Sequence, residues 1–230
     1  MPLALLYDVH GNLPALEVVL EDARQAGADR FLLGGDYALF GPFPRETVAW
    51  LRELDAVWIR GNGERWTATP AGAPDDEVVQ SAITASREAL GESLVGDLAA
   101  LGETAVDGGT LYCHASPRSD VESFLPQPAD DESELLAGVE ANRIVFGHTH
   151  LPFACANAEG FELVNPGSVG LPFDGDTRAA YAIVGDDGEI EHRRVPYDHE
   201  ASAGAVRERF SGAPFADIVA RRIERARPDV

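Results

Sequence analysis

The chain of 230 residues contains no lysine, and all of its 18 basic residues are arginines. They are outnumbered by 39 acidic residues, so the formal net charge is −21 at pH 7. Because an acidic surface repels phosphate backbones, we expect no binding to long nucleic acid. Bound divalent metals would reverse the charge locally, so a small phosphate ester could still bind. Solubility alone also explains the acidity, and we favour that interpretation.

Cysteines and long apolar runs are also scarce. The two cysteines, Cys113 and Cys155, give no disulfide framework and indicate buried thiols in a reducing compartment. No apolar stretch approaches the roughly 20 residues that a membrane span needs. The first apolar run stops at Asp8, and no basic segment precedes it. We therefore expect no signal peptide, no membrane association and a cytoplasmic protein.

What is present in the first half is an alternation of short apolar runs with amphipathic segments. We expect strands at Leu3–Tyr7, Phe31–Leu33 and Val57–Ile59, and helices at Pro14–Gly27 and Pro44–Leu54. This β-α-β-α-β order with short connections predicts a parallel sheet covered by helices. A loop at Thr67–Asp76 and a helical stretch at Glu77–Leu101 follow, and Gly91 or Gly96 is expected to interrupt that stretch.

The middle of the chain returns to short strands. The expected elements are a hairpin of Glu103–Val106 and Thr110–Cys113 around Asp107-Gly108, a loop at Pro126–Glu134, a helix at Leu135–Ala141 and a strand at Arg143–Phe146. After His150, four short strands are typical of an antiparallel meander: Phe153–Ala156, Phe161–Val164, Ala179–Val184 and Ile190–Val195. A helical tail is expected from Glu200 to Arg227.

These elements predict an α/β fold in which two sheets pack face to face as a sandwich flanked by helices. We expect one domain over residues 1–230, with a core of about 1–195 and a helical tail of about 199–227. The pattern contains neither an internal repeat nor a linker.

Polar residues of the kinds that bind metals follow five of the apolar runs. They are Asp8 and His10, Asp36, Asn62, His114, and the pair His148 and His150. The carboxyl ends of strands are where α/β proteins build their sites. In an extended segment alternate residues point the same way, so each of the two pairs could face one cavity. The ordered set therefore predicts a metal site at one rim of the sheets.

Each motif taken alone also has a structural explanation. Asp8, Asp36 and Asn62 are common turn or cap residues, and a lone His114 is more often a core histidine than a ligand. The G-H-T-H segment is more specific, because two imidazoles stand at alternate positions. Chance placement of all five motifs in this order is improbable, and that joint observation favours the metal site. His192 and His199 lie outside the set and are interpreted as structural or surface residues.

Taken together, Asp8-Val9-His10, Gly34-Gly35-Asp36, Gly61-Asn62, His114 and Gly147-His148-Thr149-His150 resemble the five motifs of the calcineurin-like metallophosphoesterase superfamily. The segment Asn165–Gly170 resembles its small bacterial and archaeal phosphodiesterase branch. The likeness spans about residues 1–195 and implies the family's four-layer α/β/β/α fold.

The resemblance implies a cofactor of two divalent metal ions. One ion would be held by Asp8, His10, Asp36 and His150, and the other by Asp36, Asn62, His114 and His148, with Asp36 as the bridge. In this family a metal-bridging hydroxide attacks phosphorus, and Asp36, Asn62 and His148 would have catalytic roles. Nitrogen and oxygen ligands without thiolate suit Mn, Fe, Zn or Ni, so the sequence does not choose the metal.

The third motif departs from the family. Many members have a histidine directly after its asparagine, which helps to protonate the leaving group, whereas this chain has Gly63 followed by Glu64. General acid catalysis is typically worth about 10²–10⁴-fold, so its loss should weigh most on poor leaving groups. We therefore expect a phosphodiesterase rather than an alkyl monoesterase. Glu64 is either a residue that holds a ligand in place or an exposed turn carboxylate.

Three functions remain open at this stage. The first is a binuclear metal-dependent phosphodiesterase acting on a small phosphate ester. The second is a metal-binding scaffold for protein interaction with little turnover, as in the related retromer subunit. The third is a protein or dinucleotide phosphatase. Arg60 and Arg65 could meet a phosphate or form ordinary surface ion pairs. A homodimer could form through an exposed edge of the second sheet.

Overall fold

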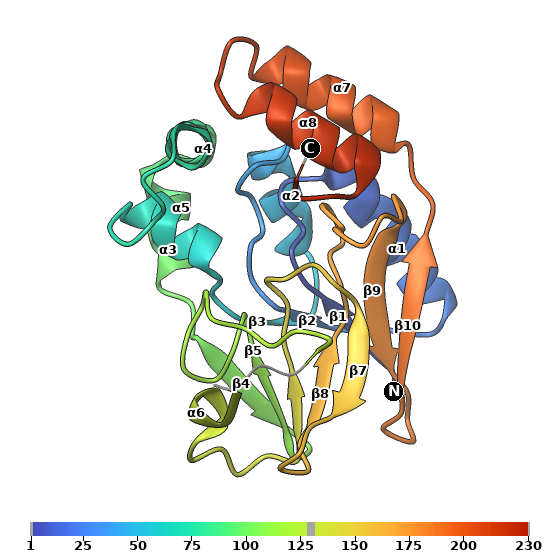
Figure 1. Ribbon diagram of the computed structural model, residues 1–230. Coiled ribbons are helices and arrows are strands. Elements are labelled where there is room, and N and C mark those ends of the chain that lie inside the picture. The colour runs from blue at the N-terminus through green and yellow to red at the C-terminus, as the bar shows by residue number, and fades with distance from the viewer. Residues whose placement is uncertain (1, 128–131, 230) are drawn as a thin grey trace.

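Two five-stranded mixed sheets form the centre of the computed structural model, which describes residues 2–127 and 132–229 (Figure 1). The first sheet has the order β10-β9-β1-β2-β3, formed by β1 (Leu3–Leu6), β2 (Arg30–Leu33), β3 (Ala56–Trp58), β9 (Ala179–Val184) and β10 (Ile190–Val195). β1, β2 and β3 run parallel, with Leu5 opposite Leu32, and β9 joins them antiparallel to β1. The expected parallel sheet is thus present, extended by an antiparallel pair.

The second sheet has the order β4-β5-β6-β8-β7. Its strands are β4 (Thr104–Asp107), β5 (Thr110–Cys113), β6 (Arg143–Val145), β7 (Phe153–Ala156) and β8 (Glu162–Asn165). β4 and β5 form the expected hairpin, and β6 lies parallel to both β5 and β8. The expectation of one antiparallel meander after His150 was wrong, because β7 and β8 join this sheet whereas β9 and β10 join the other.

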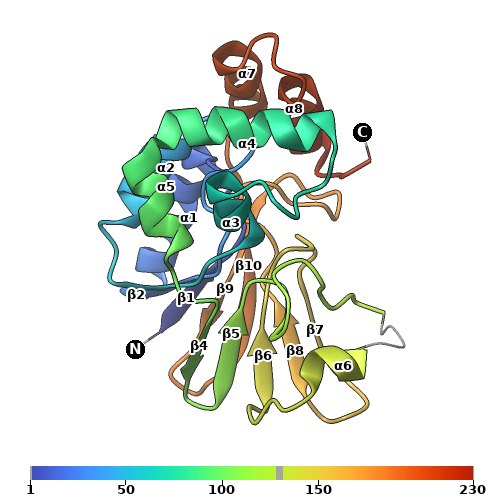
Figure 2. The same ribbon diagram turned by 90° about the vertical axis from the view of Figure 1, so that its left-hand side faces the viewer.

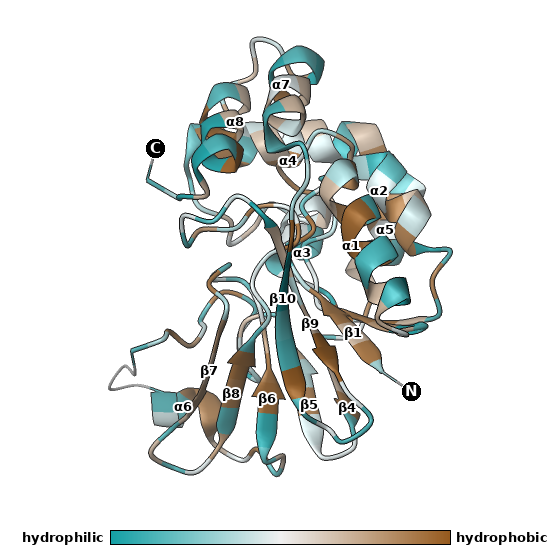
Figure 3. Cartoon of the chain, turned by 90° about the vertical axis from the view of Figure 1, so that its right-hand side faces the viewer, coloured by the Kyte–Doolittle hydropathy of each residue, from teal (hydrophilic) through white to brown (hydrophobic). Residues whose placement is uncertain are grey.

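Apolar side chains from both sheets meet in a shared core. Leu5 and Tyr7 pack there with Tyr112, Val145 and Val164. The Tyr7 hydroxyl also donates a hydrogen bond to the Val145 carbonyl at 3.2 Å, which ties the two sheets together. In Figure 3 the apolar β9 lies beside the more hydrophilic β10, the outermost strand of the first sheet. The polar β10 protects that edge from pairing with other chains.

Helices cover the outer faces of the sandwich. Their bounds are α1 (Leu13–Gln25), α2 (Pro44–Leu51), α3 (Asn62–Ala68), α4 (Glu77–Leu90), α5 (Glu92–Ala99), α6 (Glu132–Leu136), α7 (His199–Arg209) and α8 (Ala216–Arg225). α1, α2 and α5 share a core with the first sheet, and Leu136 of α6 packs against the second. The sandwich flanked by helices is therefore confirmed, with a thin outer layer over the second sheet. Figure 2 shows α4 crossing below α7 and α8.

Several helix boundaries differ from the expectation. The long helical stretch was expected to break at Gly91 or Gly96. It breaks at Gly91, whose φ of 79° ends α4. The helical tail is a pair of helices, and part of the expected loop belongs to α3. The helix expected at Leu135–Ala141 starts earlier and ends at Leu136. The expected loop at Pro126–Glu134 lies partly outside the described residues. Within the described ranges, no helix is long and apolar enough to cross a membrane.

Candidate metal centre

The predicted ligands lie in the loops that leave β1, β2, β5 and β6, and at the start of α3 after β3. Five of them adopt left-handed backbone conformations, which are unusual for residues other than glycine: Asp8, His10, Asp36, His148 and His150 have φ values of 54°, 48°, 57°, 66° and 58°. Such strained residues cluster at functional sites. The expectation that Asp8 and His10 alternate along an extended strand was wrong, because β1 ends at Leu6. The tight turns instead bring them together.

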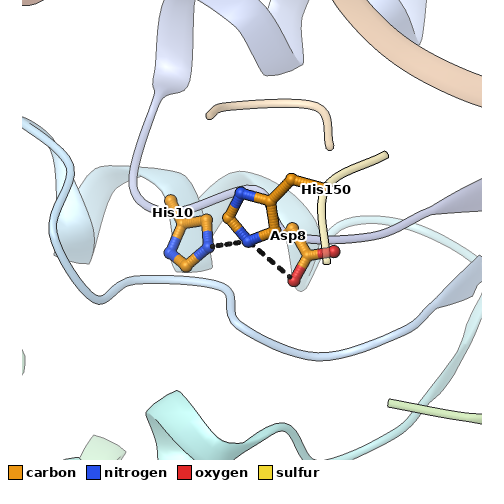
Figure 4. A group of neighbouring side chains, drawn as sticks. All are labelled: Asp8, His10 and His150. Atoms are coloured by element: carbon orange, nitrogen blue, oxygen red, sulfur yellow. Dashed lines mark hydrogen bonds and ion pairs between the residues drawn. The ribbon is translucent and has the colours of Figure 1, made fainter. Parts of the chain in front are cut away.

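Asp8, His10 and His150 form the first group of side chains (Figure 4). The Nε2 atoms of the two imidazoles lie 3.1 Å apart, and His150 Nε2 lies 3.5 Å from Asp8 Oδ1. His10 Nδ1 lies 2.9 Å from the Leu39 carbonyl oxygen. His150 Nδ1 lies 2.5 Å from the Leu171 carbonyl oxygen. A carbonyl only accepts hydrogen bonds, so each neutral imidazole has its proton on Nδ1 and a lone pair on Nε2.

These two lone pairs therefore face each other across 3.1 Å. Asp8 Oδ1 adds a third acceptor, and this buried oxygen has no hydrogen-bond partner among the described residues. Three buried acceptors directed at one point repel each other unless a cation lies among them. The donor set thus fits a divalent metal bound by two imidazoles and a carboxylate.

Asp36, Asn62, His114 and His148 form the second part of the site. His114 Nδ1 faces the Gly34 carbonyl at 2.8 Å, which again leaves a lone pair on Nε2. That Nε2 lies 2.9 Å from Asn62 Oδ1 and 3.5 Å from Asp36 Oδ1. Asp8, Asp36 and His114 also place ligand atoms within 4.8 Å of one another. The second group consequently includes Asp8 in addition to the residues that the sequence assigned to it.

The orientation of the Asn62 amide depends on what occupies this site. With its oxygen and nitrogen exchanged, the amide nitrogen would lie 2.9 Å from both His114 Nε2 and His148 Nδ1 and would donate to them. That orientation satisfies the amide by hydrogen bonds alone. The orientation in the structure directs the amide oxygen at the imidazole lone pairs, and a cation would make that arrangement favourable.

Asp36 lies between the two groups. Its Oδ2 is 3.8 Å from His10 Nε2, and its Oδ1 is 3.5 Å from His114 Nε2. One oxygen of the carboxylate therefore faces each group, which is the arrangement that a bridging ligand needs. The family resemblance implies Asp36 as the bridge, and the geometry is compatible with that role.

Burial sets the protonation of these groups. Desolvation is the main cause that raises the pKa of Asp36 to about 7, and desolvation followed by repulsion from Asp36 raises the pKa of Asp8. Desolvation also lowers the pKa of His10 to about 4 and that of His148 to about 3. The imidazoles are thus neutral and able to donate lone pairs, and a bound cation would lower the pKa values of the two carboxyl groups.

Glu64 holds the backbone of the Asp36 loop. Its buried carboxylate accepts hydrogen bonds from the backbone N–H groups of Asp36 at 2.9 Å, Tyr37 at 2.8 Å and Gly61 at 2.8 Å. Desolvation and repulsion from Asp36 raise the pKa of Glu64 to about 7. The structure therefore places Glu64 as a residue that holds a ligand loop, not as an exposed turn carboxylate.

A side chain at residue 63 would require the Asp36 side chain to move. Its N–H donates to Asp36 Oδ1 at 2.7 Å. A Cβ atom at residue 63 would also lie 2.7 Å from Asp36 Oδ1, a distance that real Cβ contacts essentially never show. Glycine at this position therefore allows the Asp36 carboxylate to lie close to the backbone of residue 63.

Further polar residues position the site without belonging to the predicted ligand set. The Asn165 amide donates to the Gly147 carbonyl at 3.0 Å, and the Ser168 hydroxyl donates to the Asp8 carbonyl at 2.7 Å. The Tyr37 hydroxyl donates to the Leu33 and Ile59 carbonyls at 2.8 Å and 2.5 Å. The Asn165–Gly170 segment was conspicuous in the sequence, whereas nothing local marked Tyr37.

Comparisons with known proteins agree with this geometry. A model of the calcineurin-like phosphoesterase superfamily domain matches residues 1–187. An uncharacterized protein of Methanocaldococcus jannaschii is 28% identical over 218 residues, which cover 85% of this chain and 88% of that protein. The phosphodiesterase YfcE of Escherichia coli K12 is 29% identical over 197 residues, covering 81% of this chain and 89% of its own length.

Solved structures extend the likeness to nearly the whole chain. A metallophosphoesterase from Sphaerobacter thermophilus is 27% identical, with a TM-score of 0.81 over 98% of this chain and 99% of its own. A hypothetical protein from Pyrococcus horikoshii shares the fold at 19% identity, with a TM-score of 0.84 and coverage of 98% of each chain. Both likenesses include the region beyond the family model, where α7 and α8 lie.

Proposed function

Because this chain belongs to the calcineurin-like phosphoesterase superfamily, we propose that it is a binuclear metal-dependent phosphodiesterase acting on a small phosphate ester. The observation that carries the proposal is the cluster of facing acceptors at His10, His150 and Asp8, which a bound divalent cation would satisfy. The name of the Escherichia coli relative, a phosphodiesterase, supports the same reaction class.

The proposed ligand sets are those that the family resemblance implies, and the two groups of side chains are compatible with them. Asp8, His10, Asp36 and His150 would hold one ion, whereas Asp36, Asn62, His114 and His148 would hold the other. When bound, the ions would lower the pKa of water and neutralise charge that develops on phosphate oxygens. Mn, Fe, Zn and Ni all suit these donors, and Mn²⁺ is the choice for a first test.

The residues of the chain contribute by fixing this arrangement before substrate binds. The carbonyls of Leu39, Leu171 and Gly34 fix the tautomers of three imidazoles, and Glu64 fixes the loop that carries Asp36. Ligands held in this way by their own hydrogen-bond partners need little rearrangement on metal binding. Such preorganisation is the main contribution of a protein to metal-assisted hydrolysis.

The proposed preference for substrates with good leaving groups rests on Gly63. A residue without a side chain donates no proton to the leaving oxygen, and the Asp36 side chain packs against residue 63. An activated or stable leaving group does not need that proton, whereas an alkoxide leaving from a simple monoester does. We therefore expect substrates with good leaving groups to be favoured.

The test is hydrolysis of bis-p-nitrophenyl phosphate beside p-nitrophenyl phosphate, by chelator-stripped protein with and without Mn²⁺. Mn²⁺ should restore turnover of the diester. Asp36→Asn should abolish the restored turnover, whereas Arg24→Ala, on the exposed end of α1, serves as the matched control. Mn²⁺ binding without turnover of either ester would contradict the proposal and favour the scaffold interpretation.

A further inference from the structure

A polar cavity of about 230 Å³ lies next to the second ligand group. His114 forms part of its wall, so the cavity borders the candidate metal centre directly. Three arginines also line it: Arg60 and Arg65, from the chain around the start of α3, and Arg118, from the loop after β5. Two carboxylates, Glu103 and Asp120, line it as well, so the basic residues outnumber the acidic ones by one.

The arginines differ in how fully their donors are used. Arg65 is paired with Asp120 through two hydrogen bonds of 2.6 Å and 2.8 Å. Arg60 pairs with Glu103, but its Nε is buried and has no partner within the described part of the chain. Arg118 is exposed, and its guanidinium group donates a 2.9 Å hydrogen bond to the Ala137 carbonyl. The exposed Arg118 is therefore the arginine of this cavity whose N–H groups are most available to a ligand oxygen.

We propose that this cavity holds the leaving half of the substrate and that this half is a phosphate, so that the bond broken is a phosphoanhydride P–O–P bond. The cavity and the absence of a proton donor at Gly63 lead to the same substrate class. A departing phosphate is stable without a proton, unlike an alkoxide, and it carries the charge that guanidinium groups bind. The inference rests on the proposed function and specifies its substrate.

The reaction is a hydrolysis of a diphosphate that carries an organic group at each end. The oxygen of water forms a bond to one phosphorus, and the bridging P–O bond breaks. The leaving phosphate keeps the electron pair of that bond, and the protons of the water pass to the products and the solvent. Both products are phosphate monoesters, and no oxidant or reductant is needed.

The test compares three substrates with wild-type protein reconstituted with Mn²⁺. P¹,P²-di(adenosine-5′) diphosphate has a phosphate leaving group, whereas the dinucleotide ApA has an alkoxide leaving group on the same nucleoside. Bis-p-nitrophenyl phosphate reports the basal phosphodiesterase. We expect kcat/KM for the diphosphate to exceed that for ApA by at least about 100-fold, in keeping with the missing acid.

Arg118→Ala should lower kcat/KM for the diphosphate by about tenfold more than for bis-p-nitrophenyl phosphate, the usual effect of losing one charge-assisted hydrogen bond. Arg118→Lys should restore part of that loss, and Arg24→Ala should change neither rate. Turnover of bis-p-nitrophenyl phosphate but not of the diphosphate, or equal losses in Arg118→Ala on both substrates, would overturn this inference and leave the proposed function standing. Turnover of no substrate would overturn the proposed function itself.

Discussion

At the scale of single residues, the tautomers of the histidines determine which nitrogen atoms are available to bind a metal. His10, His114 and His150 each donate through Nδ1 to a backbone carbonyl. The sequence shows that histidines are present, but not which nitrogen carries the proton. That distinction comes from the carbonyl partners, which lie far away in the chain, such as Gly34 for His114. It is what turns a cluster of histidines into a set of metal ligands.

Glu64→Ala should markedly lower the stability of the folded protein. Three buried N–H groups would lose their acceptor, and each unsatisfied group costs about 1–3 kcal/mol, so the free energy of unfolding should fall by about 3 kcal/mol or more. Urea unfolding monitored by circular dichroism measures this loss. Glu17→Ala, at an exposed position of α1, is the matched control and should change stability little. Equal stability of the two variants would refute the role given to Glu64.

Gly63→Ala should displace Asp36, because the new Cβ would lie 2.7 Å from Asp36 Oδ1. We expect affinity for Mn²⁺, measured by isothermal titration calorimetry, to fall by at least about tenfold, in line with other perturbations of metal-ligand packing. Gly96→Ala is the control, since nothing lies within 4 Å of a Cβ at that position of α5. Unchanged Mn²⁺ affinity in Gly63→Ala would show that the site accommodates a side chain there.

At the scale of elements, the helical hairpin of α7 and α8 supports the first ligand group although it lies beyond the family model. Phe215 and Val219 share one apolar cluster with Leu39 and Leu171, the two residues whose carbonyls hold His10 and His150. The Ser202 hydroxyl also donates to the side chain of Asn12, two residues after His10, at 3.0 Å. The hairpin therefore stabilises the loops that carry the ligands.

Phe215→Ala tests that coupling. Phe215 is 1% exposed, so the cavity left by the substitution should cost about 3–5 kcal/mol of stability and loosen the Leu39 and Leu171 carbonyls. Thermal unfolding and Mn²⁺ titration should both show a loss. Trp50→Ala removes a larger ring that is 43% exposed and should affect neither strongly. Reduced stability with unchanged Mn²⁺ affinity would argue against a link between hairpin and site.

The sequence predicted the elements better than their partners. The strands before each motif could be predicted because an apolar run that ends in glycine or polar residues is a strong local pattern. Leu3–Leu6 and Arg30–Leu33 are examples. The division of β7–β10 between two sheets was not predicted, because strand pairing depends on contacts between distant segments, such as Leu3 with Val184. α3 was missed, since Gly61-Asn62-Gly63 has the composition of a turn.

The candidate site was more predictable than the fold around it. The structure brings all seven proposed ligands into two adjoining groups, which local motifs at strand ends can anticipate. The reason given for the spacing of Asp8 and His10 was wrong, because their left-handed backbone is imposed by the loops around them. The cavity beside His114 also depends on the tertiary fold, and the sequence showed only that Arg60 and Arg65 flank a motif.

At the scale of the whole molecule, the net charge of −21 opposes both folding and the approach of an anionic substrate. Many arginines are paired with carboxylates, such as Arg193 with Asp22 at 2.8 Å. The excess of acidic groups remains, and salt screens their repulsion over about 10 Å at 0.1 M ionic strength.

We therefore expect the urea midpoint of unfolding to rise when KCl is increased from low to physiological concentration. The kcat/KM for an anionic diester should rise with KCl as well, because repulsion at long range is screened. Urea titrations and steady-state kinetics across a KCl series measure the two effects. A fall in both quantities would mean that attractive ion pairs, rather than net repulsion, dominate the electrostatics.

The most direct test of the binuclear centre is a count of metal ions per chain in relation to turnover. Chelator-stripped protein would be titrated with Mn²⁺, with bound metal measured by mass spectrometry and hydrolysis of bis-p-nitrophenyl phosphate followed at each step. We predict two ions per chain in the wild type, turnover that needs both, and loss of at least one ion in Asp36→Asn. Binding of a single ion at full activity, or turnover by the stripped protein, would contradict a binuclear centre bridged by Asp36.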